Sequence, residues 1–129
     1  MALPNGAGGY QLGDGNLTEV SMSVQAAPVA KAAAATLTAA ELANGLIVYS
    51  GATATLTLPT VADVEALVSS AKNNSSFDVN FINTGAGTLT IAVGTGWTLV
   101  GTVTSATLTS AAWRARKTGD GTWTLYRIA

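Results

Sequence analysis

The sequence predicts an all-β domain with one or two short helices, and three observations lead to this fold class. Apolar and polar residues alternate in short runs, as around Phe77, Val79 and Phe81, which is the period of a strand. Turns rich in glycine and threonine separate these runs at close spacing. We find two helix-start signals. Short strands at this spacing are typical of a sandwich, a jelly roll or a barrel.

Residues 1–36 are expected to form an N-terminal arm and linker, and residues 37–129 the β domain. Glycines crowd the start of the chain without apolar periodicity, which favours an extended arm. Residues 17–24 then alternate in a period of two, so a short strand with Val20, Met22 and Val24 on one face is predicted.

Two short helices are expected in the β domain. Thr38 and Glu41 form a T-x-x-E capping box, and an Asn-Gly stop follows, which predicts one or two helical turns over residues 39–43. Thr60 and Asp63 give the second start, because a threonine cap and an acid in the first turn satisfy free amides and suit the helix dipole. Apolar residues at helical spacing then predict a helix of about three turns.

The rest of the domain is predicted to be β. In the last part of the chain, Trp113 shares a face with Ala115 and Lys117, while Arg114 and Arg116 lie on the opposite face. The expected strands are 46–49, 54–58, 77–82, 89–93, 97–99, 102–108, 111–117 and 122–128.

The composition argues against most reactive chemistry. The 129 residues include no cysteine and no histidine, which removes thiolate sites, the commonest metal ligand and the side chain most used for acid–base work near neutral pH. We therefore expect no cofactor and no metal. The net charge is −1 and 10% of residues are charged, against about 25% in ordinary soluble domains. A surface so poor in charge tends to associate, which favours burial against partner chains.

Nucleic acid and membrane partners are not expected. The chain has no strong basic bias, and no apolar run approaches the ~20 residues of a membrane span. Its start lacks the basic and apolar regions of a secretory signal, so we expect a soluble product that is not exported by that route.

The best candidate for an enzymatic site is weak, and we expect no enzyme. Asp63 and Glu65 are the only close acidic pair, and a carboxylate pair can cleave a glycosidic bond. Residues two apart on a helix point in different directions, however, so they cannot share a substrate. Capping is the expected role of Asp63, and exposure on a solvated face that of Glu65.

Three tryptophans leave a second kind of binding open. Trp97, Trp113 and Trp123 could form an aromatic platform for sugars, as exposed rings do on some β-sandwiches. The alternative is burial, since aromatic side chains remove large areas from water. Either a carbohydrate-binding module or a packed core would explain these residues.

The one basic cluster lies near the end of the sequence. It consists of Arg114, Arg116, Lys117 and Arg127. These cations could form a solvated face of the sheet, or a patch that meets an acidic surface on a partner and guides its orientation. Both interpretations stay open.

Several stretches together resemble small decoration (cement) proteins of tailed-phage heads. They are GGYQLGDGNLTE near the start, TLTAAELANGLI, TLTLPT before the second helix, SSFDVNFINTGAGTLTIAVGTGWTLVG and the final WTLYRI. The similarity covers nearly all of the chain from Gly8 to Ile128. SFDVNFINT followed by TLTIAVGTGWTLVG is its most characteristic part.

The resemblance implies a jelly-roll-like β-sandwich that forms homodimers or homotrimers on the outer surface of the virion. Such proteins are made in the host cytoplasm and clamp neighbouring major capsid subunits after the shell expands. Related β domains occur in head fibres, so a carbohydrate-binding or receptor-binding module is the alternative. The arm would be the segment that crosses onto a neighbour. Its expected contact residues are Tyr10, Gln11, Asp14, Asn16 and Glu19.

Overall fold

The first capping signal opens helix α1 (Ala39–Asn44) in the computed structural model, which describes residues 22–129. The backbone N–H of Glu41 donates to the Thr38 hydroxyl over 3.1 Å, and the Thr38 N–H donates to the Glu41 carboxylate over 3.0 Å. Gly45 ends the helix with a φ of 80°, a conformation that glycine adopts without steric cost. The predicted capping box is confirmed.

The second signal opens helix α2 (Val61–Leu67). The Asp63 N–H donates to the Thr60 hydroxyl over 3.3 Å, as expected for a cap. Val61 and Val64 are buried, but Leu67 is 50% exposed. The helix has seven residues, so it is shorter than the predicted three turns, although Val68 directly after it still packs against the core.

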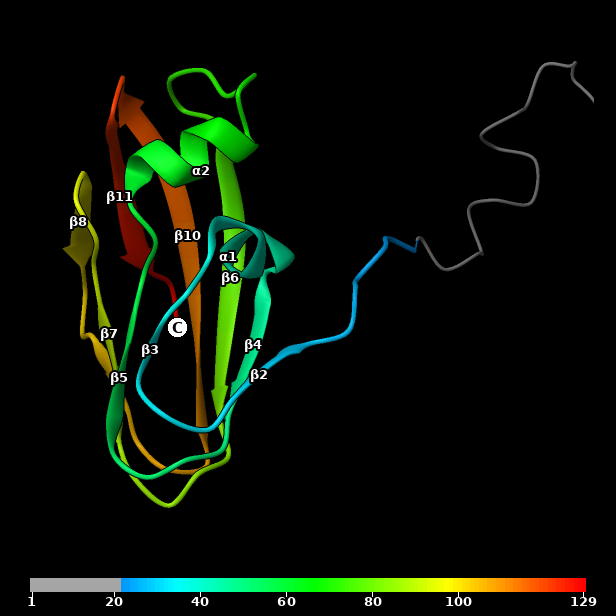
Figure 1. Ribbon diagram of the computed structural model, residues 1–129, viewed down its shortest axis with the longest axis vertical. Helices are drawn as coiled ribbons and strands as arrows, with labels where there is room; N and C mark the ends of the chain where they lie inside the picture. Colours follow the sequence, from blue (N-terminus) through cyan, green and yellow to red (C-terminus); the bar gives the residue numbers. More distant parts are fainter. Residues whose placement is uncertain (1–21) are drawn as a thin grey trace, which may run out of the picture.

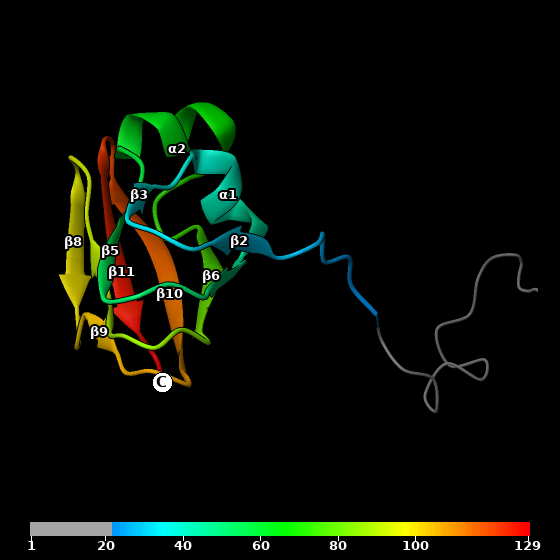
Figure 2. The same ribbon diagram turned by 60° about the horizontal axis from the view of Figure 1, so that its bottom comes forward.

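Two β-sheets face each other, with both helices toward one end (Figures 1 and 2). The six-stranded sheet has the order β2 (Val29–Lys31), β4 (Leu46–Tyr49), β6 (Ser76–Asn83), β10 (Thr109–Gly119), β11 (Thr122–Arg127), β8 (Trp97–Val100). The four-stranded sheet has the order β3 (Ala35–Thr36), β5 (Ala54–Thr57), β7 (Leu89–Ala92), β9 (Thr104–Ser105). The all-β class with two short helices is confirmed for the described residues.

The first six strands alternate between the two sheets. β2, β4 and β6 pair in parallel in the larger sheet, and β3, β5 and β7 pair in parallel in the smaller one. Each passage through both sheets therefore stacks on the previous one like a turn of a coil. β10 then returns antiparallel between β6 and β11.

This connectivity does not confirm a jelly roll. A jelly roll is built from antiparallel Greek keys, whereas among the strands of residues 22–129 only β10–β11, β10–β6 and β7–β9 pair antiparallel. The expected strand over residues 102–108 is also shorter, since only Thr104 and Ser105 pair. The sandwich of two sheets is present with a different order of strands.

The end of the predicted linker belongs to the folded body. β2 and β3 are edge strands of the two sheets, although both lie within residues 1–36. An ion pair of 2.8 Å between Lys31 and Glu41 also ties β2 to α1. The hydrogen bond from Lys31, followed by that from the Thr38 N–H, lowers the pKa of Glu41.

The core fills the space between the sheets and beneath the helices. Trp113, Trp123, Tyr49 and Phe81 are its largest side chains with less than 2% exposure. Phe77 packs against Trp123 with ring centroids 5.7 Å apart, and its neighbours on β6 alternate in burial. The strand period read from residues 77–81 is thus confirmed.

Candidate interaction surfaces

The outer face of the six-stranded sheet, opposite to the core, carries a run of uncharged side chains. Register places Leu46 beside Asn80 and Val48 beside Ile82, so these four share a face. Ser110 and Ala112 continue it on β10, where they pair with Ile82 and Asn80. We call these six residues, Leu46, Val48, Asn80, Ile82, Ser110 and Ala112, the outer patch.

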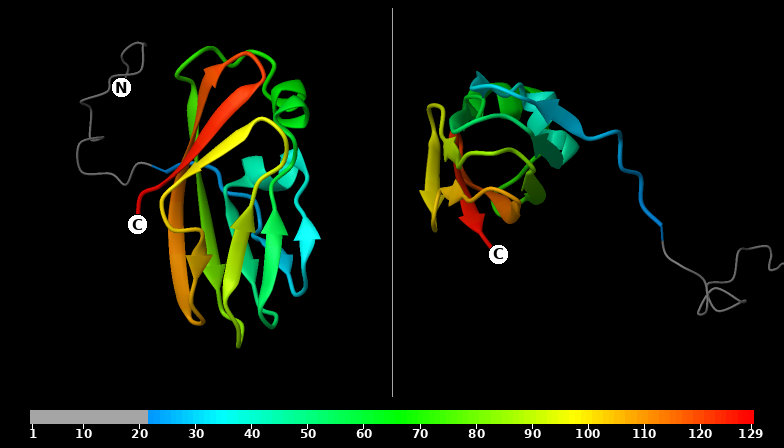
Figure 3. Two further views of the ribbon diagram at one scale, coloured as in Figure 1. Left: turned by 90° about the vertical axis from the view of Figure 1, so that its left-hand side faces the viewer. Right: turned by 90° about the horizontal axis from the view of Figure 1, so that it is seen from below.

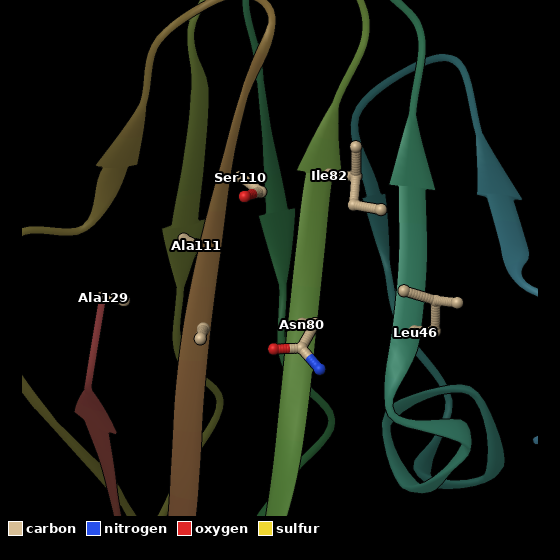
Figure 4. A pocket seen from close by; sticks show the side chains of 7 residues that line it. Leu46, Asn80, Ile82, Ser110, Ala111 and Ala129 are labelled. Carbon is tan, nitrogen blue, oxygen red and sulfur yellow. The ribbon is translucent and has the colours of Figure 1, made fainter.

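The outer patch is hollowed at its centre. A depression of ≈ 330 Å³ lies over β4, β6 and β10 and is bordered by Ala129 (Figure 4). Leu46 and Ile82 form one wall (Figure 4), and the lining on β10 includes the small side chains of Ser110 and Ala112. Polar side chains normally cover the solvent face of a sheet, so apolar residues at this position indicate a surface that another molecule can cover.

Charged residues lie farther along the same face. The Arg114 Nε donates to Asp78 over 2.8 Å, and this hydrogen bond raises the pKa of Arg114. Arg116 donates to the Tyr126 hydroxyl over 2.7 Å and to Asn74 over 2.8 Å. Since Asp78 offsets one of the two cations, this end of the face carries a small positive charge.

Lys117 does not join these arginines. It is 9% exposed and lies on the core side of β10, where its ammonium contacts the Glu65 carboxylate at 3.3 Å and donates to the Ala71 carbonyl over 3.2 Å. Alternation along the strand already separated Lys117 from Arg114 and Arg116. Grouping the cations by sequence proximity was therefore wrong for this residue.

Arg127 is also separate. It pairs in register with Trp113 on β10, and its guanidinium lies 5.8 Å from the centre of that buried ring. It donates to the carbonyls of Thr102 and Thr104 over 3.0 and 2.6 Å. Arg127 thus fastens β11 to the segment after β8. The four predicted cations do not form one patch.

Glu65 connects α2 to the hairpin formed by β10 and β11. Its carboxylate accepts from the Gly121 N–H at 3.2 Å and from the Trp123 indole N–H at 3.2 Å, and it pairs with Lys117. Burial alone would raise the pKa of Glu65, but the hydrogen bonds from Gly121, Trp123 and Lys117 lower it. The expected solvated face was wrong for Glu65. Asp63 is exposed, and only its backbone N–H takes part in the cap, by donating to the hydroxyl of Thr60, so the two carboxylates do not converge.

The three tryptophans form no exposed platform. Trp97, Trp113 and Trp123 are 7%, 1% and 1% exposed. Trp97 donates to the Pro59 carbonyl over 2.8 Å and packs against Trp123. Of the two interpretations of these residues, burial in the core is correct.

Residues 22–28 leave β2 and run outward from the body, and we call them the extended segment (Figures 1 and 3). Only its base is held, by hydrogen bonds from Gln25 to the Asn44 carbonyl and from Asn44 to the Ala27 carbonyl, each 3.0 Å. Met22 is 87% and Val24 100% exposed. Neither lies in a strand, so this part of the predicted strand over residues 17–24 is not confirmed. Its remainder and the predicted contacts Tyr10, Gln11, Asp14, Asn16 and Glu19 lie outside the described residues.

Leu108 is a further exposed apolar side chain, on the turn before β10. It is 79% exposed and has a φ of 59°, which costs roughly 1–2 kcal/mol for a residue with a β-carbon. Glycine or asparagine usually occupies such a position. An exposed leucine kept in a strained conformation is a candidate contact residue.

Sequence reasoning missed the outer patch and Leu108. The signal for the patch was present, because Ile82 alternates with the buried Phe81 and had to lie on the other face. Finding Leu46 beside it required knowing that β4 pairs with β6. Nothing in the residue pattern distinguished Leu108 from the strand that was expected there.

The chain has no identified relative. No family model matches it, and no curated protein or solved structure is significantly similar to it. Within residues 22–129, no group of three or more metal-ligating side chains comes together. Neither described helix is long and apolar enough to cross a membrane.

Proposed function

We propose that this chain is a structural virion protein that binds the outside of a phage capsid and stabilises it by bridging neighbouring major capsid subunits. Exposure of the extended segment carries the proposal. Met22 and Val24 project from the body with almost all of their surface in water. Burying such side chains releases about 25 cal/mol per Å² of apolar area, so the segment favours a partner that covers it.

Two further observations support an assembly role. The outer patch, and Leu108 two residues before its member Ser110, add apolar surface to a body with few charges. A protein that bridges subunits needs at least two contact regions, and many copies on one particle make modest contacts sufficient. The two-sheet body is the coarse feature that this chain shares with the jelly-roll-like domain the resemblance implies.

The mechanism is mechanical. A protein that binds only the assembled lattice raises the free energy needed to separate its subunits, as any ligand specific for one state stabilises that state. On docking, backbone pairing of the extended segment along a neighbouring sheet edge would offset the entropy lost when the segment is fixed in place. Arg114 and Arg116 lie where they would orient the body against an acidic surface.

The test is binding of the purified chain to expanded capsids, with and without residues 1–28, a deletion that removes the extended segment and ends before β2. Full-length chain should sediment with particles, and the truncated chain should bind at least about tenfold more weakly because its arm contacts are lost. Circular dichroism of the truncated chain should be that of the folded β domain. Equal binding by both chains would remove the arm from the mechanism. No binding by either would overturn the proposal.

Carbohydrate binding by a head-fibre module is the less favoured function. Burial of all three tryptophans removes the residues on which it depended. A glycan array probed with the full-length chain separates the two functions.

A further inference from the structure

We propose that the extended segment of one copy covers the outer patch of a second copy, so that two chains exchange their segments about a two-fold axis. This exchange of extended segments, called arm exchange below, rests on the proposed function only because it takes the segment as an element that docks on another molecule. It names a second copy as the partner of that element. Exchange of an identical element between copies is a low-cost route to a dimer.

The first argument is chemical. No residue from Met22 to Ala30 is charged, and none of the residues bordering the hollow in the outer patch is charged. The projecting side chains, Met22 and Val24, are apolar, as are the walls formed by Leu46 and Ile82. Bringing the two surfaces together buries apolar area and leaves no ionised group without a partner.

The second argument concerns position. The segment leaves the sheet at β2, and the outer patch begins on the adjacent strand, β4. Gln25 and Ala27 are hydrogen-bonded to Asn44 of the same body, so the free part of the segment is residues 22–24, which reach roughly 10 Å. The patch spans two strand spacings of about 4.8 Å each, from β4 to β10. The segment is therefore long enough to lie across the patch of a neighbouring body. In the isolated chain it does not lie on its own patch, because Met22 and Val24 are exposed.

The third argument is the shape of the receiving surface. The ≈ 330 Å³ depression is open to solvent, with the larger side chains of Leu46 and Ile82 on the side of β4 and β6 (Figure 4). On the side of β10 its lining consists of small residues, among them Ser110 and Ala112. A side chain such as that of Val24 can enter it without displacing the strands. A two-fold arrangement forms this contact twice, which doubles the apolar area buried for a single orientation of the two bodies.

Because the chain contains no cysteine, pairs of introduced cysteines can test whether the extended segment contacts the outer patch of a second copy. Single variants Val24→Cys and Ile82→Cys are mixed and oxidised, and Met22→Cys is paired with Ile82→Cys in the same way. At least one mixture should give a covalent dimer joining the two different variants. Val24→Cys mixed with Thr98→Cys is the matched control, because Thr98 lies on the same outer face but on β8, at the far edge of the sheet. Yields no higher than in this control would overturn arm exchange.

The double variant Val24→Cys/Ile82→Cys separates the two ways in which a segment can cover a patch. Exchange predicts a dimer on a denaturing gel without reductant. A monomer with an internal disulfide would show that each segment covers its own patch, which contradicts the exchange.

Self-association of the isolated chain gives an independent measurement. Ser110→Lys places a charge in the lining of the hollow and should weaken dimer formation at least about tenfold in sedimentation equilibrium. Thr98→Lys adds the same charge outside the patch and should leave the dimer intact. Undiminished dimerisation of Ser110→Lys, or a wild-type chain that is monomeric at millimolar concentration, would overturn the inference.

Capsid binding is measured on particles and self-association on the free chain, so the two proposals fail separately. A chain that dimerises through its segments but ignores capsids contradicts the proposed function alone. A chain that binds capsids as a monomer contradicts arm exchange alone.

Discussion

Asn83 is a single buried side chain that holds two loops at the end of the sandwich away from the helices. Its amide donates to the carbonyls of Gly87, Ser105 and Ala106 over 2.8, 3.1 and 3.2 Å, and its oxygen accepts from the Gly85 N–H at 3.0 Å. The residue is fully buried, so no water replaces these partners. Asn83 therefore fixes the position of the loop that precedes β7 relative to the turn that carries Leu108.

Replacing Asn83 with alanine should lower the free energy of unfolding by at least about 2 kcal/mol, because each buried group left without a partner costs about 1–3 kcal/mol. Urea denaturation measures the change. Asn80→Ala is the matched control on the outer face of the same strand, where the effect should stay within about 0.5 kcal/mol. Similar losses of unfolding free energy in the two variants would show that the buried hydrogen bonds of Asn83 contribute no more to stability than an exposed asparagine does.

Glu65 makes stability depend on pH. Its pKa in the folded chain lies below the ordinary value of 4.5, so its contribution is fully present above that value and is lost as the pH falls through the folded-state pKa. Glu65→Gln should be less stable than the wild type at pH 7, and the difference should shrink below about pH 4.5. Asp63→Asn, on the exposed side of the same helix, serves as control. A difference that stays constant with pH would show that the charge of Glu65 contributes nothing.

Residue roles were predictable from the sequence where alternation along a strand decided them. Trp113, Ala115 and Lys117 share the core face as their spacing requires. The environment of Lys117 was not predictable, because its partner Glu65 is on a helix 52 positions earlier in the chain. Contacts between distant elements depend on the order of the strands, which the spacing of residues does not encode.

The turn before β10, which carries Leu108, is expected to affect both the stability of the fold and the binding of the chain to capsids. Leu108→Gly should raise the free energy of unfolding by up to about 1 kcal/mol, since glycine adopts the left-handed conformation without the clash of a β-carbon. The same change should weaken binding to capsids, because it removes an exposed apolar side chain.

Leu108→Ala is the matched control for this turn. It removes the apolar side chain but keeps the β-carbon, so it should weaken binding without the gain in stability. If Leu108→Gly proves less stable than Leu108→Ala, or if neither changes binding, the turn is not a strained contact element.

The elements themselves were largely predictable, whereas their pairing was not. Capping residues located both helices, and alternation located most strands. β6 and β7 follow each other across a short turn, which is also the signature of a hairpin, yet they lie in different sheets. The close approach of the loops at Gly51 and Gly85 explains why the chain can cross between sheets there. A β-carbon on Gly85 would clash with the Gly51 carbonyl oxygen.

At the scale of the whole molecule, the low charge and the exposed apolar surfaces have one common explanation. The extended segment, the outer patch and Leu108 are all uncharged. A freely dissolved protein gains nothing from such surfaces, which promote association. The proposed burial against neighbouring proteins on a capsid, and against a second copy, would use all of them.

The disruption temperature of expanded capsids, measured with and without saturating chain, tests this role most directly. Bound chain should raise that temperature by several degrees, and intact particles should retain it at a fixed number of copies per capsid. A chain that leaves the disruption temperature unchanged and washes off the particles would contradict its assignment as a capsid-stabilising protein.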